Sequence, residues 1–334
     1  MAIIFKPQQV LIREAALQYP LGQKLWQHFQ SAGPEPLLYK QKIPSNRCES
    51  VRDKFFQGKR TLVVSLWRGG EFQSCKPSAH WQLPLVSGCP GHCQYCCLHT
   101  NLAKRPYLNV HVNIEEILAK AHSLSQTEPT IFEGAATSDP VAIEPLTGSL
   151  AQAISFFAET PLARFRFVTK FTDIESLLPL KHRGKTEIRF SINCQEIISS
   201  FERGVPPLKL RLAASGKVAR AGYPVGFLIG PIFAFPLWRE EYDQMLRQLR
   251  ENLPQGAYTF ELISHRFTLR ARESISQIYP DNKLPLETQE RSFKYGQFGY
   301  GKYVYPKAVL QEFEDFFREK IAHYFPASEI LYFV

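Results

Sequence analysis

From residue 83 onward, apolar stretches of strand length alternate with helical patterns of apolar and polar positions. This alternation is typical of βαβ units with parallel strands. We therefore predict an α/β fold with an incomplete barrel of strand–helix units, whose chemistry lies at the C-terminal strand ends. The predicted strands span 83–86, 130–136, 164–170, 187–192, 225–232 and 258–263. Predicted helices begin at Asn113 and Thr172, each with a capping-box glutamate (Glu116, Glu175), and also span 146–159 and 239–252.

Weaker patterns flank this region. Before it, helical patches at 10–19 and 22–29 and strand-like stretches at 37–43 and 61–67 predict an N-terminal α/β layer. After it, basic and aromatic residues accumulate, and the glycine-interrupted, β-prone run 293–305 predicts a hairpin, followed by a helix from Pro306. The chain is thus predicted to divide into 1–82 (N-terminal layer), 83–265 (partial barrel) and 266–334 (basic and aromatic hairpin plus helix).

Composition indicates a globular protein with a nucleic-acid partner. The 334 residues are 44% hydrophobic, enough for a sizeable core. There is no apolar run of about 18 residues, and the N-terminus becomes polar at Lys6, so we expect a soluble, cytoplasmic protein without a signal peptide. The net charge of +9 favours a polyanion such as nucleic acid, although solubility alone also accounts for such a charge.

Cysteine placement indicates metal chemistry. Four of the seven cysteines lie between positions 89 and 97, and Cys89, Cys93 and Cys96 have the spacing C-x-x-x-C-x-x-C. A four-iron four-sulfur (4Fe–4S) cluster held by three Cys keeps one iron open for an outside ligand, whereas structural zinc takes four closed ligands. The surrounding Gly and Pro residues supply the turns that such a loop needs.

Two other interpretations of this loop remain open. One is a disulfide pair with a spare Cys, which a reducing cytosol disfavours. The other is zinc completed by His92, His99 or Cys97.

The spacing, with the aromatic Tyr95 before the third Cys, resembles the motif of the radical S-adenosylmethionine (SAM) superfamily. Further stretches are similar to one family within it, spore photoproduct lyase, in order along nearly the whole chain: 76–78, 87–98, 132–139, 166–170, 189–193, 259–268 and 300–305. The resemblance implies a radical SAM partial (β/α)6 barrel that carries a 4Fe–4S cluster and SAM. It also implies a DNA repair lyase that reverses a methylene-bridged thymine dimer. In that reaction a 5′-deoxyadenosyl radical takes hydrogen from the lesion, and a thiol returns hydrogen to the product radical.

The resemblance also implies site residues and partners. The positions that match the family's SAM contacts are Tyr95, Ser138, Lys170, Ser191 and Gly230. The implied partners are DNA with a thymine dimer and an electron donor such as flavodoxin or ferredoxin. We expect a monomer without a membrane partner.

Two departures from the family concern catalysis. Ala136 stands where the family has its hydrogen-donor Cys, and Cys97 stands where it has a Tyr that relays the radical towards SAM. We hypothesise that the thiol has moved to Cys97, which with Tyr95 is a candidate catalytic residue. Strand alternation would place Ala136 on the same face as Ser138, beside SAM. The alternatives are Cys194, which closes the fourth predicted strand, or no thiol donor at all, with Cys97 only filling space.

The hairpin tip departs as well. The family tends to place an Arg-Tyr pair there that wedges into the duplex, whereas this chain has Gln297 and Phe298. Phe298 can still wedge or stack on a base, and Lys294 and Lys302 can neutralise phosphate. We predict that these four residues and Tyr300 contact DNA, although the aromatic residues could equally belong to the core.

Two other functions fit the same features. One is a radical SAM enzyme that acts on a different nucleic-acid substrate, for which the loss at Ala136 is the argument. The other is a nucleic-acid-binding iron–sulfur protein without turnover.

Overall fold

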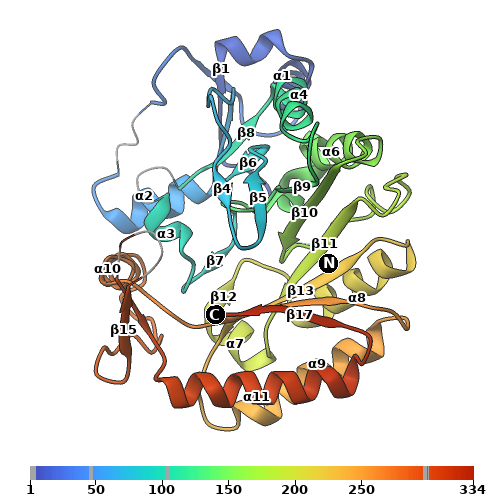
Figure 1. Cartoon of the computed structure of the whole chain (residues 1–334). Coiled ribbons are helices and arrows are strands. Elements are labelled where there is room, and N and C mark those ends of the chain that lie inside the picture. Colours follow the sequence, from blue (N-terminus) through green and yellow to red (C-terminus); the bar gives the residue numbers. More distant parts are fainter. Residues whose placement is uncertain (1–4, 45–47, 103–105, 296–298, 300) are drawn as a thin grey trace. The chain divides into compact units, whose positions relative to one another are not determined.

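The computed structural model describes residues 5–44, 48–102, 106–295, 299 and 301–334 (Figure 1). The chain forms two compact units. Unit 1 comprises Met1–Gly91 and Leu102–Ile188, and unit 2 comprises His92–Asn101 and Arg189–Val334. The three-part division at residues 82 and 265 stays a prediction.

The N-terminal sheet of unit 1 is largely parallel. Its strand order is β2-β1-β3-β8-β6, in which only β6 is antiparallel to its neighbour. The strands are β1 (Gln9–Arg13), β2 (Leu37–Tyr39), β3 (Thr61–Ser65), β6 (Val86–Ser87) and β8 (Leu108–His111). The helix predicted at 10–19 is wrong, because the buried apolar run Val10–Leu11–Ile12 forms the central strand β1 and only a 3-10 helix, η1 (Glu14–Gln18), follows it.

Three helices accompany this sheet. Helix α1 (Pro20–Ser31) confirms the helix predicted at 22–29. Helix α2 (Val51–Lys59), which the sequence analysis missed, begins at Ser50, whose Oγ accepts a hydrogen bond of 2.9 Å from the amide of Asp53. Helix α4 (Ile114–Leu124) is confirmed, and Asn113 pairs with Glu116, since its Nδ2 donates to the carboxylate at 2.7 Å. The pair is not a capping box, because Oδ1 of Asn113 accepts from the amide of Trp67 at 2.8 Å and not from an amide of the helix.

Unit 1 also contains strands in the order β10-β9-β5-β4. The strands are β4 (Ser74–Cys75), β5 (Ala79–Gln82), β9 (Thr130–Glu133) and β10 (Ala163–Thr169). Between β9 and β10 the chain forms η2 (Pro140–Ile143), α5 (Glu144–Thr147) and α6 (Ser149–Ala158). β5, β9 and β10 are parallel, so the predicted βαβ pattern holds. Two details differ from the prediction. The strand predicted at 83–86 lies earlier in the chain, as β5. Residues 175–179 form turns and not the predicted helix after Thr172, because Pro179 cannot continue a helix.

Unit 2 contains strands in the order β17-β14-β13-β11. β13 (Val225–Ile232), β14 (Thr259–Ser264) and β17 (Glu329–Phe333) are parallel, and β11 (Thr186–Ile192) begins before the division at residue 188. The helices are α7 (Gln195–Phe201), α8 (Leu208–Arg220), α9 (Trp238–Asn252), α10 (Leu269–Ile278) and α11 (Lys307–Tyr324). α9 and α11 lie side by side (Figure 1), joined through Trp238, which packs on Phe313 and Phe316. The α/β fold class is confirmed, while α10 and β17 were not predicted.

Unit 2 also contains the second part of the cysteine loop, from His92, and the hairpin, both built from short elements. β7 (His92–Cys93) pairs antiparallel with β12 (Glu202–Arg203), and α3 (Leu98–Asn101) follows the loop. The predicted hairpin is confirmed as β15 (Ser292–Tyr295) and β16 (Gly301–Val304), antiparallel to each other. Its tip residues Gln297, Phe298 and Tyr300 lie outside the described residues.

Over the described ranges, no single helix is both long and apolar enough to cross a membrane. One bent pair of helical segments, Pro140–Thr147 and Ser149–Ala158, meets that test by length and composition.

Candidate active site

The first part of the cysteine loop is held within unit 1. The amide of Gly88 donates to the carbonyl of Thr137 at 2.9 Å, and Gly88 forms an isolated parallel bridge with Ser138. Gly88 has φ +86°, and a Cβ there would lie 2.3 Å from the carbonyl oxygen of Tyr107, so only glycine fits. The residue before Cys89 is therefore fixed against Ser138, one of the predicted SAM contacts.

A buried lysine, which the sequence analysis missed, supports the same loop. Lys59, at the end of α2, is 4% exposed, and its Nζ donates to the carbonyls of Cys89 at 2.7 Å and Gly91 at 2.9 Å. The ammonium also lies 5.3 Å from the ring centroid of Phe55. Because an ammonium is costly to bury without partners, these contacts tie α2 firmly to the loop. The one sign in the sequence is that Lys59 ends a helix beside the apolar strand β3.

Asp139 connects two further predicted positions in unit 1. Its carboxylate accepts from the Thr169 hydroxyl at 2.7 Å and from the backbone amide of Lys170 at 2.8 Å. Asp139 is 6% exposed and directly follows Ser138 in the chain. It therefore brings the ends of β9 and β10 together, with Ser138 and Lys170 on either side. The sequence analysis quoted Asp139 within the motif 132–139 but gave it no role.

Ala136 does not lie on a strand. β9 ends at Glu133, and residues 134–137 form a turn in which Ala136 is exposed. The argument from strand alternation that placed Ala136 on the face of Ser138 is therefore wrong. Gly134, which opens this turn, packs closely against Phe165, since a Cβ at position 134 would lie 2.8 Å from the Phe165 ring.

Cys93 and Cys96 lie on a tight turn in unit 2. The amide of Cys96 donates to the carbonyl of Cys93 at 3.2 Å, and the Gln94 amide donates to the carbonyl of Phe201 at 2.9 Å. Nε2 of the buried His99 lies 2.7 Å from the same Cys93 carbonyl. Cys89 is four residues before Cys93, so the chain keeps their Cα atoms within roughly 14 Å.

The three thiols of Cys89, Cys93 and Cys96 fit a four-iron cluster, which three Cys can hold while one iron stays open. Zinc needs its ligands around one centre, whereas the thiolates of a four-iron cluster bind different irons and stand farther apart.

Tyr95 is fixed by a buried ion pair. Its hydroxyl donates to the Glu202 carboxylate, and Arg211 bonds to the other oxygen of Glu202 at 2.5 Å. Burial, followed by the nearby Glu202, raises the pKa of Tyr95 well above its usual value, so the phenol stays protonated. Arg211 also donates to the carbonyl of Ser191 at 3.1 Å. The network thus joins two predicted SAM contacts of unit 2, Tyr95 and Ser191.

Gly230 lies in β13, where its surroundings leave little space for a side chain. A Cβ at this position would lie 3.1 Å from Cβ of Ile263 and 3.2 Å from Cδ2 of Leu228. The next residue, Pro231, accepts a hydrogen bond of 2.8 Å from the Asn193 side chain. A side chain at 230 would thus require Ile263 of β14 and Leu228 of β13 to shift by a few tenths of an ångström.

The two candidate thiol donors have opposite environments. Cys97 is exposed, with the cations of Arg266 and Lys302 nearby. A hydrogen bond with Cys96, aided by these charges, lowers the pKa of Cys97 to about 7. Cys194 is 0% exposed, and burial raises its pKa to about 12. Cys97 is accessible to solvent, whereas Cys194 is not.

The hairpin places two like charges opposite each other. Lys294 and Lys302 are cross-strand partners, an arrangement that is unfavourable without an anion between them. Burial, together with Arg266, lowers the pKa of Lys302. All four residues of β15 are exposed, among them Phe293 at 53% and Tyr295 at 75%. These two aromatic residues, which the sequence analysis did not select, are suited to stack on bases.

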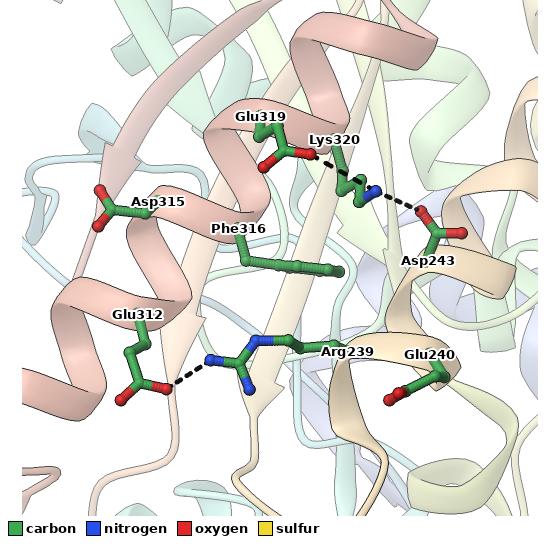
Figure 2. A pocket seen from close by; sticks show the side chains of 8 residues that line it. All are labelled: Arg239, Glu240, Asp243, Glu312, Asp315, Phe316, Glu319 and Lys320. Carbon is green, nitrogen blue, oxygen red and sulfur yellow. Dashed lines mark hydrogen bonds and ion pairs between the residues drawn. The ribbon is translucent and has the colours of Figure 1, made fainter.

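A cavity of about 600 Å³ between α9 and α11 lies outside the predicted site (Figure 2). Its charged side chains largely pair with one another: Arg239 with Glu312 at 2.6 Å, and Lys320 with Asp243 at 3.4 Å. None of the residues predicted to act in catalysis or binding lines it.

Comparison with known proteins gives a consistent result. The family model described as spore photoproduct lyase matches residues 5–334. The chain is 41% identical to the spore photoproduct lyase of Clostridium acetobutylicum over 332 residues, which cover 98% of both proteins. It is also 41% identical to that of Bacillus subtilis over 340 residues, again with 98% of both covered.

Solved structures match over the whole chain. A mutant spore photoproduct lyase with bound AdoMet (SAM) and dinucleoside spore photoproduct has a TM-score of 0.95 and 41% identity, with 99% of both chains covered. A spore photoproduct lyase complexed with dinucleoside spore photoproduct has a TM-score of 0.96 and 40% identity, with 99% of both covered. This likeness confirms the predicted partial-barrel fold of the radical SAM type.

Proposed function

The chain belongs to the spore photoproduct lyase family, and we propose that it reverses the methylene-bridged thymine dimer of DNA with Cys97 as the hydrogen donor. It is a radical SAM lyase of DNA repair whose cofactors are a 4Fe–4S cluster and SAM. The observation that carries this function is the 41% identity over 98% of both proteins to curated spore photoproduct lyases.

The cluster ligands in this proposal are Cys89, Cys93 and Cys96. A cluster held by these three thiolates would supply the electron for the reductive cleavage of SAM, which is the source of the radical chemistry of the family. Lys59 supports the assignment, because it fixes the carbonyls of Cys89 and Gly91 and so limits the conformations of the loop.

The SAM contacts in this proposal are Tyr95, Ser138, Lys170, Ser191 and Gly230. In unit 1, Asp139 orders the backbone of Lys170 next to the Ser138 turn. In unit 2, Arg211 and Glu202 order Tyr95 and Ser191. Hydroxyl and ammonium groups of this kind bind the carboxylate and ribose of SAM.

The hydrogen donor in this proposal is Cys97. Its S–H bond breaks as a C–H bond forms on the product radical, and a small thiol in solution returns one hydrogen atom to the resulting thiyl radical. Three observations support this assignment. The family's donor position holds Ala136, Cys97 is exposed beside Lys302 of the hairpin, and Cys194 is fully buried.

The function is tested with anaerobically reconstituted, chemically reduced protein, SAM and a dinucleotide that contains the dimer. We expect 5′-deoxyadenosine together with the intact dinucleotide in which both thymines are restored. Absence of 5′-deoxyadenosine would favour an iron–sulfur binding protein without turnover. 5′-Deoxyadenosine without repair would favour a different nucleic-acid substrate.

For partners, we propose lesion-containing DNA, a small acidic electron-transfer protein such as flavodoxin or ferredoxin, a monomeric state and a cytoplasmic location. The net charge of +9 supports both polyanionic DNA and an acidic redox partner. Reduction of the cluster by either protein, and the mass in size-exclusion chromatography with light scattering, test these points.

A further inference from the structure

We propose that the carboxyl edge of the N-terminal sheet carries a phosphate-binding pocket, distinct from the residues assigned to repair. β2, β1 and β3 are adjacent and parallel, so their C-terminal ends lie at one edge. Arg13 is the last residue of β1, Lys40 directly follows β2, and Arg68 lies three residues beyond the end of β3. Three cationic side chains thus come from three neighbouring strand ends.

These side chains line a cavity of about 550 Å³ within unit 1. The lining consists of Arg13, Glu14, Ala15, Lys40, Gln41 and Arg68. Three cations therefore face a single carboxylate. Nε of Arg13 is buried without a hydrogen-bond partner, and in the described ranges none of the three cations has an ion pair. Glu116 of α4 is engaged by Tyr19 at 2.6 Å and Asn113 at 2.7 Å and does not line the cavity.

The topology independently favours a ligand at this edge. In the sheet, β2 lies on one side of β1, and the next strand in the chain, β3, lies on the other side of β1. This reversal is a topological switch point, and open α/β sheets bind ligands in the crevice outside the strand ends at such a point. Arg13 and Arg68 lie on either side of it.

The chemistry of the lining selects the ligand. Unpaired cations held near one another repel unless an anion lies between them. Guanidinium groups donate two parallel hydrogen bonds that match phosphate oxygens, and Lys40 adds a point charge. The phosphate can belong to the DNA backbone or to a small free phosphate compound, and the experiment distinguishes these sources.

The test uses the full-length, cluster-loaded protein and calorimetric titration with inorganic phosphate. We expect saturable binding to one site that weakens at least about tenfold in the K40Q/R68Q variant, since two charge-assisted contacts are lost. The matched control is K6Q/K54Q, which removes two exposed lysines of unit 1 that do not line the cavity, and its affinity should stay within about twofold of wild type. E14Q should tighten binding, a gain that misfolding cannot imitate.

The source is identified with a lesion-free duplex. If the DNA backbone occupies the pocket, K40Q/R68Q lowers the slope of log K against log salt by about 1 relative to the control, because the pocket neutralises one phosphate. If the slope matches the control while phosphate binding is lost, the ligand is a small free phosphate compound. Absence of saturable phosphate binding in wild type, or equal weakening in both double variants, would overturn the proposal. None of these readouts depends on repair activity.

Discussion

Nζ of Lys59 lies 2.7 Å from the carbonyl oxygen of Cys89, so a buried ammonium from α2 fixes the loop that carries the proposed cluster ligands. K59M removes both hydrogen bonds to the loop and leaves two carbonyls with one partner fewer. We expect a loss of about 2 kcal/mol in loop stability. The loaded variant should therefore lose iron faster under air or chelator, measured as iron per chain and visible absorbance. The control is K54M, which replaces an exposed lysine on the same helix. Equal iron loss in K59M and K54M would contradict the proposal that Lys59 fixes the cysteine loop.

Replacement of each candidate thiol tests the hydrogen donor. In C97A we expect 5′-deoxyadenosine formation to persist while the yield of repaired thymidine falls and side products of the unquenched radical appear. C194A should repair normally, because Cys194 is 0% exposed. Product analysis by mass spectrometry measures both outcomes. Undiminished, clean repair in C97A would rule out this assignment.

Removal of Glu202 tests the network beneath Tyr95. In E202Q the buried Arg211 loses its counter-ion, and breaking a buried pair in this way costs about 3 kcal/mol. We expect a lower unfolding temperature and weaker SAM binding, measured by thermal denaturation and by calorimetry on the loaded protein. E196Q, an exposed glutamate on α7, should behave like wild type. Unchanged SAM affinity in E202Q would contradict the proposal that this network positions Tyr95 to bind SAM.

Glu144 predicts a pH dependence of stability. Burial raises its pKa from 4.5 to about 7, although its carboxylate accepts from the amides of Leu150 and Ala151 at 2.8 and 2.9 Å. The folded state therefore binds more protons than the unfolded state between these two pKa values. This contribution to stability is fully present below pH 4.5, falls as pH rises and is lost above about pH 7.

The expected size of this effect is roughly 3 kcal/mol across the window. In E144Q, thermal unfolding from about pH 4.5 to about pH 8 should show a correspondingly flatter profile than wild type. E128Q changes an exposed glutamate and should keep the wild-type slope. A wild-type slope in E144Q would mean that another group titrates.

The cross-strand lysines of the hairpin predict the salt dependence of DNA binding. K294Q/K302Q should reduce the slope of log K against log salt by about 2, because each lysine neutralises one phosphate. Fluorescence anisotropy with a duplex oligonucleotide at several salt concentrations measures this slope. K209Q/K307Q, which removes two exposed lysines elsewhere in unit 2, should leave it unchanged. An equal change in both variants would indicate a diffuse charge effect.

Most long elements were predictable from local patterns. The predicted strand at 225–232 matches β13, and α9 and β10 differ from prediction by about one residue at their ends. The hydrophobic pattern suffices to predict these elements, because a strand buried on both faces and a helix buried along one stripe each leave a distinct local pattern of apolar residues. It fails at 10–19, since a short apolar run fits a buried strand as well as a helix. It also fails at Asn113, whose side chain binds Trp67 from a distant part of the chain.

The sequence by itself determined the family and its cofactors, because short motifs, among them the cysteine spacing, and the order of these motifs along the chain identify both. Only the tertiary structure decided how the site residues are held. Lys59, Asp139 and Arg211 each bond to a group that lies 9 to 32 residues away in the chain. Buried polar groups must find partners wherever packing brings them, and sequence periodicity does not record that choice. The same reason applies to Arg13, Lys40 and Arg68, which are unremarkable in sequence until three parallel strands place them at one edge.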